Sequence, residues 1–199
     1  MSYIKSIPAL LFVLSGCVSA PRYEPTDAAS PVDSSTSAAA DKELALFQQG
    51  ITSLNNAQLD RAESDFRELT RSRPGLAGPW INLALIDVKK KNFADAEKNI
   101  AKALERNPRM PQAYNMLGFI EVAKGNMVKA AENYQKAIAL KSDYALAHYN
   151  IALLHDIYLH DIAAAVQHYK RYLELTNHQD KKTTDWVTEL ERGLARGPQ

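Results

Sequence analysis

The feature that most constrains the fold is a motif that returns along the chain at a nearly constant interval. An alanine stands at Ala62, recurs after 34 residues at Ala96, after 34 more at Ala130 and after 35 more at Ala165. Four residues beyond each alanine comes a large side chain: Phe66, Ile100, Tyr134 and Tyr169. This spacing places both residues on one face of a helix. Such periods predict stacked helical hairpins, each burying its apolar face against its neighbours.

The repeated pair also predicts how each hairpin packs. A small residue at the start of the second helix lets the two backbones approach closely, and the large residue one turn later fills the gap beside it. Pro74 and Pro108 end the second helices of their units, because proline has no N–H to continue the hydrogen-bond ladder. The pairs Asn55-Asn56 and Gly125-Asn126 predict turns inside hairpins.

A second pattern precedes three of the alanines: a ring-bearing residue, an apolar residue three positions later and a small residue after that. The three copies are Trp80-x2-Leu83-Ala84, Tyr114-x2-Leu117-Gly118 and His148-x2-Ile151-Ala152. Leu46 and Gly50 hold the corresponding places in the first unit, with Gln49 where a leucine is usual. Together these patterns resemble the tetratricopeptide repeat family.

The resemblance implies an all-α fold, a right-handed superhelical array of about four tetratricopeptide-like hairpins with a C-terminal capping helix. We expect the repeats within residues 41–178, followed by a cap and tail at 180–199. The individual repeats are expected at 43–76, 77–110, 111–144 and 145–179.

The chain begins with a pattern typical of a targeting segment. Lys5 supplies a positive charge, and an apolar run extends from Ile7 to Leu14. That run is too short to cross a bilayer, which takes about 20 residues in a helix. Residues 1–16 therefore read as a signal peptide, with Leu14-Ser15-Gly16-Cys17 as the processing site.

The processing site resembles a bacterial lipobox, and Cys17 is the only cysteine of the chain. The resemblance implies a diacylglycerol on the Cys17 thiol and acyl chains such as palmitate; an ordinary secretory signal with an incidental cysteine is the alternative. Val18 stands where an aspartate would favour the inner membrane, which indicates the periplasmic face of the outer membrane. Residues 17–40, rich in Ser, Thr, Ala and Pro, are expected to form a disordered tether.

Charge narrows the class of partner. The chain has 24 Lys and Arg against 23 Asp and Glu, which argues against nucleic acid as a partner, since nucleic-acid binding leaves a basic footprint. The one compact basic run is Lys89-Lys90-Lys91. It is interpreted as a solvated helix end, where cations complement the helix dipole, and a phosphate or lipid headgroup contact is the alternative.

Motifs of catalysis or of cofactor binding are not found in the sequence, so no cofactor is expected. The one candidate constellation is the histidine group of the fourth unit: His148, His155, His160 and His168, with Asp156 and Asp161 nearby. His148 and His155 are seven residues apart, about 10.5 Å along a helix, which is too far to share one ion. His148 aligns with Trp80 and Tyr114 and is interpreted as a packing residue. A small metal-dependent enzyme is the alternative.

The family resemblance implies that the first helix of each pair lines a concave groove for a protein partner. The candidate groove residues are Phe47, Ile51, Ile81, Asn82, Leu85, Asn115, Phe119, Tyr149, Asn150 and Leu153. Most are apolar, which disfavours an acidic tail and favours an apolar helix or extended segment as the ligand. The asparagine amides offer hydrogen bonds to the ligand's backbone.

The last segment, Asp185 to Arg196, carries Trp186, Leu190 and Leu194 at helical spacing. It is interpreted as the capping helix; filling of the chain's own groove and self-dimerisation are left open. These features together predict a non-catalytic scaffold in the cell envelope. In architecture and anchor it resembles lipoproteins that help secretins and pili assemble, with adaptors of peptidoglycan enzymes as the nearest rival.

Overall fold

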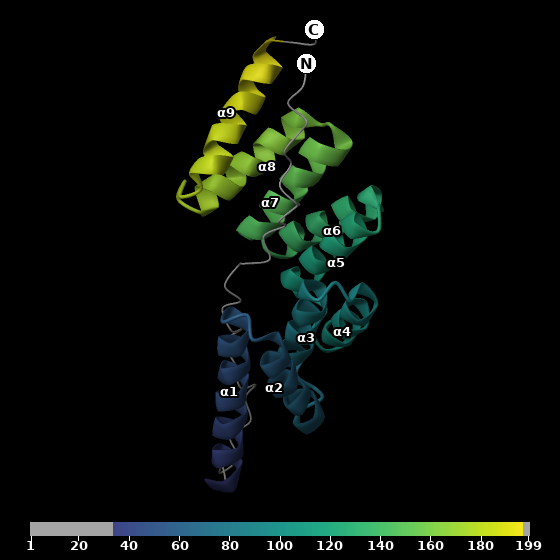
Figure 1. Ribbon diagram of the computed structural model, residues 1–199, viewed down its shortest axis with the longest axis vertical. Coiled ribbons are helices and arrows are strands. Elements are labelled where there is room, and N and C mark those ends of the chain that lie inside the picture. Colours follow the sequence, from purple (N-terminus) through teal and green to yellow (C-terminus); the bar gives the residue numbers. More distant parts are fainter. Residues whose placement is uncertain (1–33, 197–199) are drawn as a thin grey trace. The chain divides into compact units, whose positions relative to one another are not determined.

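A computed structural model describes residues 34–196, and every regular element in that range is a helix (Figure 1). The expected all-α array of four hairpins with a terminal helix is confirmed. The helices of the hairpins are α1 (Ser34–Asn55), α2 (Leu59–Ser72), α3 (Ala77–Lys89), α4 (Phe93–Arg106), α5 (Pro111–Ala123), α6 (Met127–Leu140), α7 (Ala145–Leu153) and α8 (Ile162–Leu175). A short π-helix, η1 (Leu154–Leu159), extends α7, and α9 (Lys181–Arg196) ends the array.

The predicted signal peptide, Cys17 and the first part of the predicted tether lie outside the described residues. Helix α1 begins at Ser34, inside the segment 17–40 that was assigned to the tether. Three consecutive alanines, 38–40, favour helix here, because alanine loses the least side-chain entropy in that conformation. Within residues 34–196, no helix is long and apolar enough to cross a membrane.

The chain divides into two compact units, and their boundary falls inside α5. The N-terminal unit, residues 34–116 of the described chain, holds the first two hairpins and the start of α5. The C-terminal unit, residues 117–196, holds the rest. Each unit has its own buried core and is described by itself below.

In the N-terminal unit the packing follows the predicted repeat. Ala62, Ala96 and Phe66 have no exposed surface, and Ile100 is 1% exposed. The small residue of α1 is equally necessary: a Cβ added to Gly50 would lie 2.9 Å from ring carbons of Phe66. The two helices of this hairpin therefore meet at a glycine that faces an aromatic ring.

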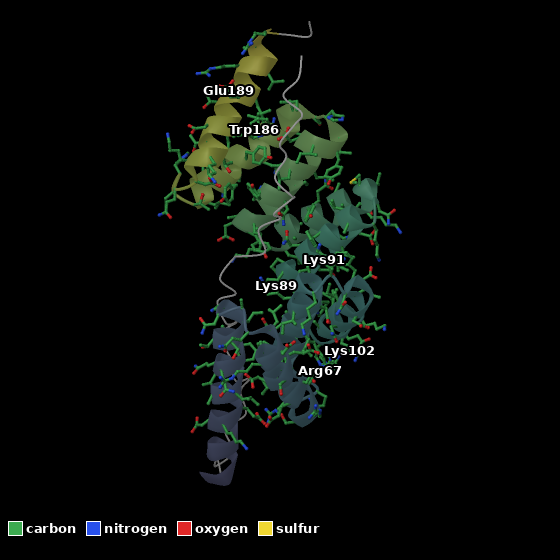
Figure 2. The ribbon with its side chains drawn as sticks, viewed as in Figure 1. Arg67, Lys89, Lys91, Lys102, Trp186 and Glu189 are labelled. Atoms are coloured by element: carbon green, nitrogen blue, oxygen red, sulfur yellow. The ribbon has the colours of Figure 1, made fainter. Side chains whose placement is uncertain are left out.

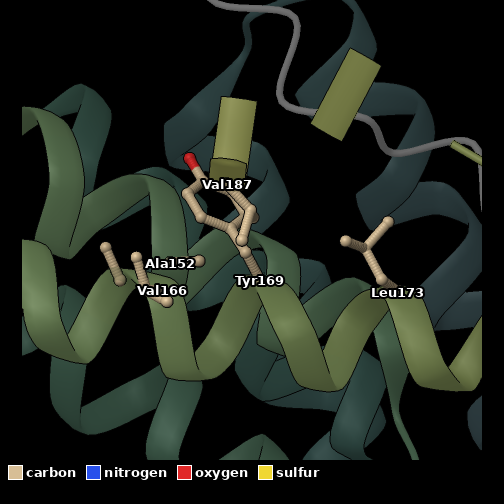
Figure 3. Close-up of a cluster of buried hydrophobic side chains, with 6 residues drawn as sticks. Ala152, Val166, Tyr169, Leu173 and Val187 are labelled. Atoms are coloured by element: carbon tan, nitrogen blue, oxygen red, sulfur yellow. The ribbon is translucent and has the colours of Figure 1, made fainter. Parts of the chain in front are cut away.

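The C-terminal unit repeats this contact more tightly. A Cβ at Gly118 would lie 2.6 Å from the ring of Tyr134, which is fully buried one turn after Ala130 on α6. In the fourth hairpin Ala152 takes the place of the glycine, and Tyr169 that of the aromatic ring. Figure 3 shows the cluster around Tyr169, which includes Val187 of α9. Its buried members are Ala152, Ala165, Val166, Tyr169, Leu173 and Val187.

Ring-bearing residues connect each hairpin to the one before. The Trp80 indole N–H donates to the Pro74 carbonyl over 3.2 Å, and the Tyr114 hydroxyl donates to the Pro108 carbonyl over 3.3 Å. His148 Nε2 lies 3.2 Å from the carbonyl oxygen of Ser142. Each of the three bonds links residues six positions apart. Its acceptor is a carbonyl just after the end of a second helix, where that helix supplies no N–H to bind it. The prediction that His148 takes the structural place of Trp80 and Tyr114 is confirmed.

The turn inside each hairpin has one residue in the left-handed conformation. These residues are Ala57 (φ 57°), Lys91 (φ 61°), Gly125 (φ 83°) and His160 (φ 54°). Only one is glycine, the residue that adopts this conformation without strain. The asparagine pair 55–56 thus precedes the left-handed residue of its turn.

The extra residue in the last period is accommodated by η1. The His160 N–H donates to the His155 carbonyl five residues earlier, and the Asp161 N–H donates to the same carbonyl over 3.0 Å. A π-turn takes up one added residue while the flanking helix keeps its register. The insertion therefore leaves Ala165 and Tyr169 in their repeat positions and alters only the tip of the hairpin.

Helix α9 packs on α8 through one buried side. Val187 and Thr183 are buried, and Val187 joins the cluster around Tyr169 and Leu173 of α8. Most of its other residues are exposed and many are charged, although Trp186 and Leu194 are exposed large apolar side chains. As the last helix of the described array, α9 takes the position of the predicted cap.

Ala130→Leu should lower the free energy of unfolding by about 1 to 3 kcal/mol, because a larger side chain overpacks the contact between α5 and α6. Ala139→Leu, an exposed position on the same helix, is the matched control and should change it by less than about 0.5 kcal/mol. Urea unfolding followed by circular dichroism measures both. Equal midpoints for the two variants would contradict the packing described for Ala130.

Candidate functional site

The candidate groove residues of the N-terminal unit are more enclosed than an open surface requires. Ile81 and Leu85 are 6% and 8% exposed, while Phe47 and Ile51 are half-buried. The Phe47 ring packs edge-on against Phe66, with centroids 5.6 Å apart. The expectation of an open apolar face is therefore wrong for Ile81 and Leu85, because side chains of the first helices also fill the space between neighbouring helices.

Asn82 and Asn115 are the amides of this half of the groove, each 1% exposed. The Asn82 side-chain nitrogen donates to the Gly78 carbonyl over 2.9 Å. Its oxygen, Oδ1, is buried without a hydrogen-bond partner in the part of the chain that the structure describes. A buried amide oxygen without a donor is costly, about 1 to 3 kcal/mol. Asn82 Oδ1 is therefore an acceptor that lacks a donor.

The C-terminal unit holds the other candidates. Asn150 is fully buried, whereas Phe119, Tyr149 and Leu153 are half-buried. Phe119 and Leu153 pack against the cluster around Tyr134. These side chains therefore contribute to the core as well as to the surface, which sequence reasoning did not foresee.

Aromatic rings gather beside this half of the groove. Tyr149 contacts Tyr169 and Tyr172 of α8, with ring centroids 5.8 Å and 4.8 Å apart. Burial raises the pKa of Tyr172 to about 12, and the negative charge of Asp180 adds to this effect. The Tyr172 hydroxyl donates a hydrogen bond to Asp180 Oδ2 over 3.2 Å. These tyrosines are neutral at physiological pH and act through packing and hydrogen bonds.

The histidine group of the fourth unit is partly assembled. His148 Nδ1 lies 3.1 Å from His168 Nδ1, and the His155 ring stacks on His168 at 6.1 Å. His160 lies exposed in the hairpin turn. Among the described residues, no three His, Cys, Asp or Glu side chains are placed to hold a metal ion. The geometry adds no support to the metal-dependent alternative.

The hydrogen bonds define the proton positions in the histidine pair. The Ser142 carbonyl only accepts, so His148 Nε2 must carry a proton. In the neutral ring Nδ1 is then an acceptor, and His168 Nδ1 must donate to it. Burial lowers the pKa of His168 to about 4, with His148 and His155 as further causes, and burial also lowers the pKa of His148.

A pairing that sequence reasoning missed joins η1 to α9. The Trp186 indole N–H donates to Asp156 Oδ2 over 2.7 Å, and the Tyr169 hydroxyl donates to the same oxygen over 3.2 Å. Trp186 is nevertheless 48% exposed. The sequence had flagged both Trp186 and Asp156, but no local spacing signals a contact across 30 residues.

The basic run at the end of α3 has two different environments. Lys90 Nζ lies 2.6 Å from Asp60 and 2.8 Å from Glu63, an ion pair between the first and second hairpins that raises the pKa of Lys90. Lys89 and Lys91 are exposed (Figure 2). The interpretation of this run as a solvated helix end is therefore wrong for Lys90, because its ammonium group forms ion pairs that link two repeats.

Two segments match known family models. Residues 77–110 match the model described as tetratricopeptide repeat, and residues 118–155 match the model described as TPR repeat. No curated protein matches the chain significantly in sequence.

Solved structures share the fold. A thermophilic TPR protein of Thermus thermophilus is 19% identical, with a TM-score of 0.63 over 74% of this chain and 80% of that one. PilF of Pseudomonas aeruginosa is 18% identical, with a TM-score of 0.68 over 78% of this chain and 70% of that one. The O-GlcNAc transferase of Thermobaculum terrenum is 19% identical, with a TM-score of 0.62 over 68% of this chain but 26% of that one. At these identities the likeness shows the fold alone.

The chain thus contains tetratricopeptide repeats in the arrangement typical of that fold. Repeats of this kind indicate a protein-interaction scaffold, in which adjacent hairpins offer a continuous surface.

The histidine pair predicts a loss of stability in acid. The unfolded chain binds a proton on His168 near pH 6.5, but the folded chain does so only near pH 4. The free energy of unfolding should therefore fall between these pH values, by about 1 to 2 kcal/mol once solvent screening of the half-buried ring is allowed for.

Urea unfolding at pH 7 and pH 5 measures this loss. His168→Asn keeps an N–H donor near Nδ1 without a titrating ring and should flatten the difference. An unchanged pH dependence in that variant would assign the loss to other groups.

Proposed function

We propose that this chain is a non-catalytic protein-interaction scaffold, anchored by lipid on Cys17 to the periplasmic face of the bacterial outer membrane. It helps to assemble a cell-envelope machine such as a pilus, a secretin or a peptidoglycan-enzyme complex. Its repeats bind an apolar segment of a partner along the first helices of the hairpins. The repeats support the scaffold role, and the Leu-Ser-Gly-Cys site supports the anchor.

One observation carries the binding role. Asn82 Oδ1 is buried without a donor among residues 34–196, on a helix whose neighbouring positions Ile81 and Leu85 are apolar. A backbone N–H of a bound segment supplies the missing donor once the segment displaces the side chains that cover Asn82, which is 1% exposed. The similarity to PilF in fold is compatible with an envelope role and does not by itself establish one.

Asn82→Ala should weaken partner capture by roughly three- to tenfold, because it removes the acceptor offered to the partner, and should lower stability by about 1 kcal/mol, because the bond to the Gly78 carbonyl is lost as well. Asn133→Ala is the matched control, since Asn133 makes the same bond to a carbonyl four residues earlier but lies on α6, a second helix. Cross-linking of the full chain in the envelope, followed by mass spectrometry, compares the captured proteins. Equal losses in both variants would remove Asn82 from the binding surface.

Phe119→Ser combined with Leu153→Ser should weaken capture further, by a few kcal/mol, as loss of central apolar anchors does. Because both side chains are half-buried, the double variant should also melt at a lower temperature. Val128→Ser, at a position that is 72% exposed on α6, controls for loss of surface apolar area. Undiminished capture by a double variant that remains folded would place the partner elsewhere.

Cys17→Ser should abolish lipidation and shift the chain out of the membrane fraction, because the thiol is the only one available for the lipid. Ser15→Ala keeps a small residue at the processing site and should still be lipidated. Labelling with a palmitate analogue and fractionation measure both outcomes. Labelling of the Cys17→Ser variant would exclude the proposed anchor.

A further inference from the structure

The pairing of Asp156 with Trp186 leaves a carboxylate without a compensating cation. Both of its hydrogen-bond donors, the Trp186 indole and the Tyr169 hydroxyl, are neutral, and both bind Oδ2. The other oxygen, Oδ1, accepts no hydrogen bond from residues 34–196. Asp156 is half-buried, so its charge is less well solvated than that of a surface carboxylate.

Three carboxylates of α9 differ in this respect. Asp185 lies 3.8 Å from Lys181, Glu189 pairs with Arg192, and Glu191 lies 2.5 Å from Lys170. Each of these ion pairs is exposed to solvent. Asp180 is half-buried with neutral donors, as Asp156 is, but its donors bind both of its oxygens, whereas the two donors to Asp156 share Oδ2.

An aromatic face lies beside this charge. Trp186 lies on α9 (Figure 2) and is 48% exposed, although the hydrogen bond from its indole N–H to Asp156 orients its ring. An oriented indole face attracts cations through its quadrupole, and a carboxylate at its edge adds charge-assisted hydrogen bonds. Arginine fits both, because its planar guanidinium stacks on rings and donates to carboxylates.

A purely structural role does not require the charge. The two neutral donors, Trp186 of α9 and Tyr169 of α8, could equally bind an uncharged amide oxygen, which costs less to bury than a carboxylate does. The negative charge of Asp156 is therefore available to a cation.

We propose that Asp156 and Trp186 form a binding site for a basic side chain, foremost an arginine, of the partner polypeptide. The guanidinium stacks on the indole and donates to Asp156 Oδ1. This inference rests on the proposed scaffold function and refines it, because the bound segment then carries a cation next to its apolar residues.

The test uses nuclear magnetic resonance of the purified full chain, observing the two indole N–H signals. Nα-acetyl-arginine methylamide is the cationic probe, and the citrulline analogue is its neutral match. The arginine probe should shift the Trp186 signal in a saturable way, with a dissociation constant on the order of millimolar. The citrulline probe should not. Trp80 is an internal control, since Lys102 and Arg106 already cover its ring, at 4.2 Å and 5.3 Å.

Asp156→Asn retains an oxygen that accepts the Trp186 proton and should weaken binding of the arginine probe at least tenfold. Asp185→Asn removes the same charge from the neighbouring surface and should leave the affinity within twofold. Equal losses in the two variants, an equal response to citrulline, or no saturable shift in the native chain would each overturn the site. The comparison of the two probes on the native chain does not depend on how the variants fold.

The outcome also separates this site from the scaffold function. Envelope cross-links that depend on Asn82 but not on Asp156 would overturn the cation site and leave the scaffold proposal intact. Saturable arginine binding without any Asn82-dependent or Phe119-dependent capture would retain the site and overturn the scaffold proposal.

Discussion

The architecture depends on the close approach of the two helices within each hairpin. Gly118 faces the ring of Tyr134 at a distance that leaves no room for a Cβ, and Gly50 faces Phe66 in the same way. Buried alanines on the second helices complete these contacts. Because a tight pair presents a uniform surface to the next pair, the array can stack with a period of about 34 residues.

The connections between hairpins use a different interaction, which tolerates changes in chemistry. Tryptophan, tyrosine and histidine each reach back six residues to a carbonyl oxygen. Their common property is an N–H or O–H at the end of a flat ring, not size or charge. At His148, the tautomer that donates to the Ser142 carbonyl leaves Nδ1 to accept a hydrogen bond from His168. Protonation of His168 in acid therefore destabilises the fold.

The proposed cation site lies where the repeat is imperfect. The added residue of the fourth unit forms the π-turn η1, and η1 carries Asp156. Helix α9, which lacks a partner helix, presents Trp186 to that carboxylate. A cap that closes the array thus also brings an aromatic ring to the end of the surface formed by α7.

The sequence by itself determined the all-α repeat of helical hairpins and the buried alanines, since these follow from a local period that every unit repeats. It also identified His148 as a packing residue by alignment with Trp80 and Tyr114. Only the tertiary structure decided how far groove residues such as Ile81 are enclosed, because burial depends on neighbouring helices rather than on spacing. The Asp156 and Trp186 pair, 30 residues apart, likewise exists only through the packing of α9 on α8. The local period determines which face of a helix is buried, and tertiary packing determines which side chains contact that face.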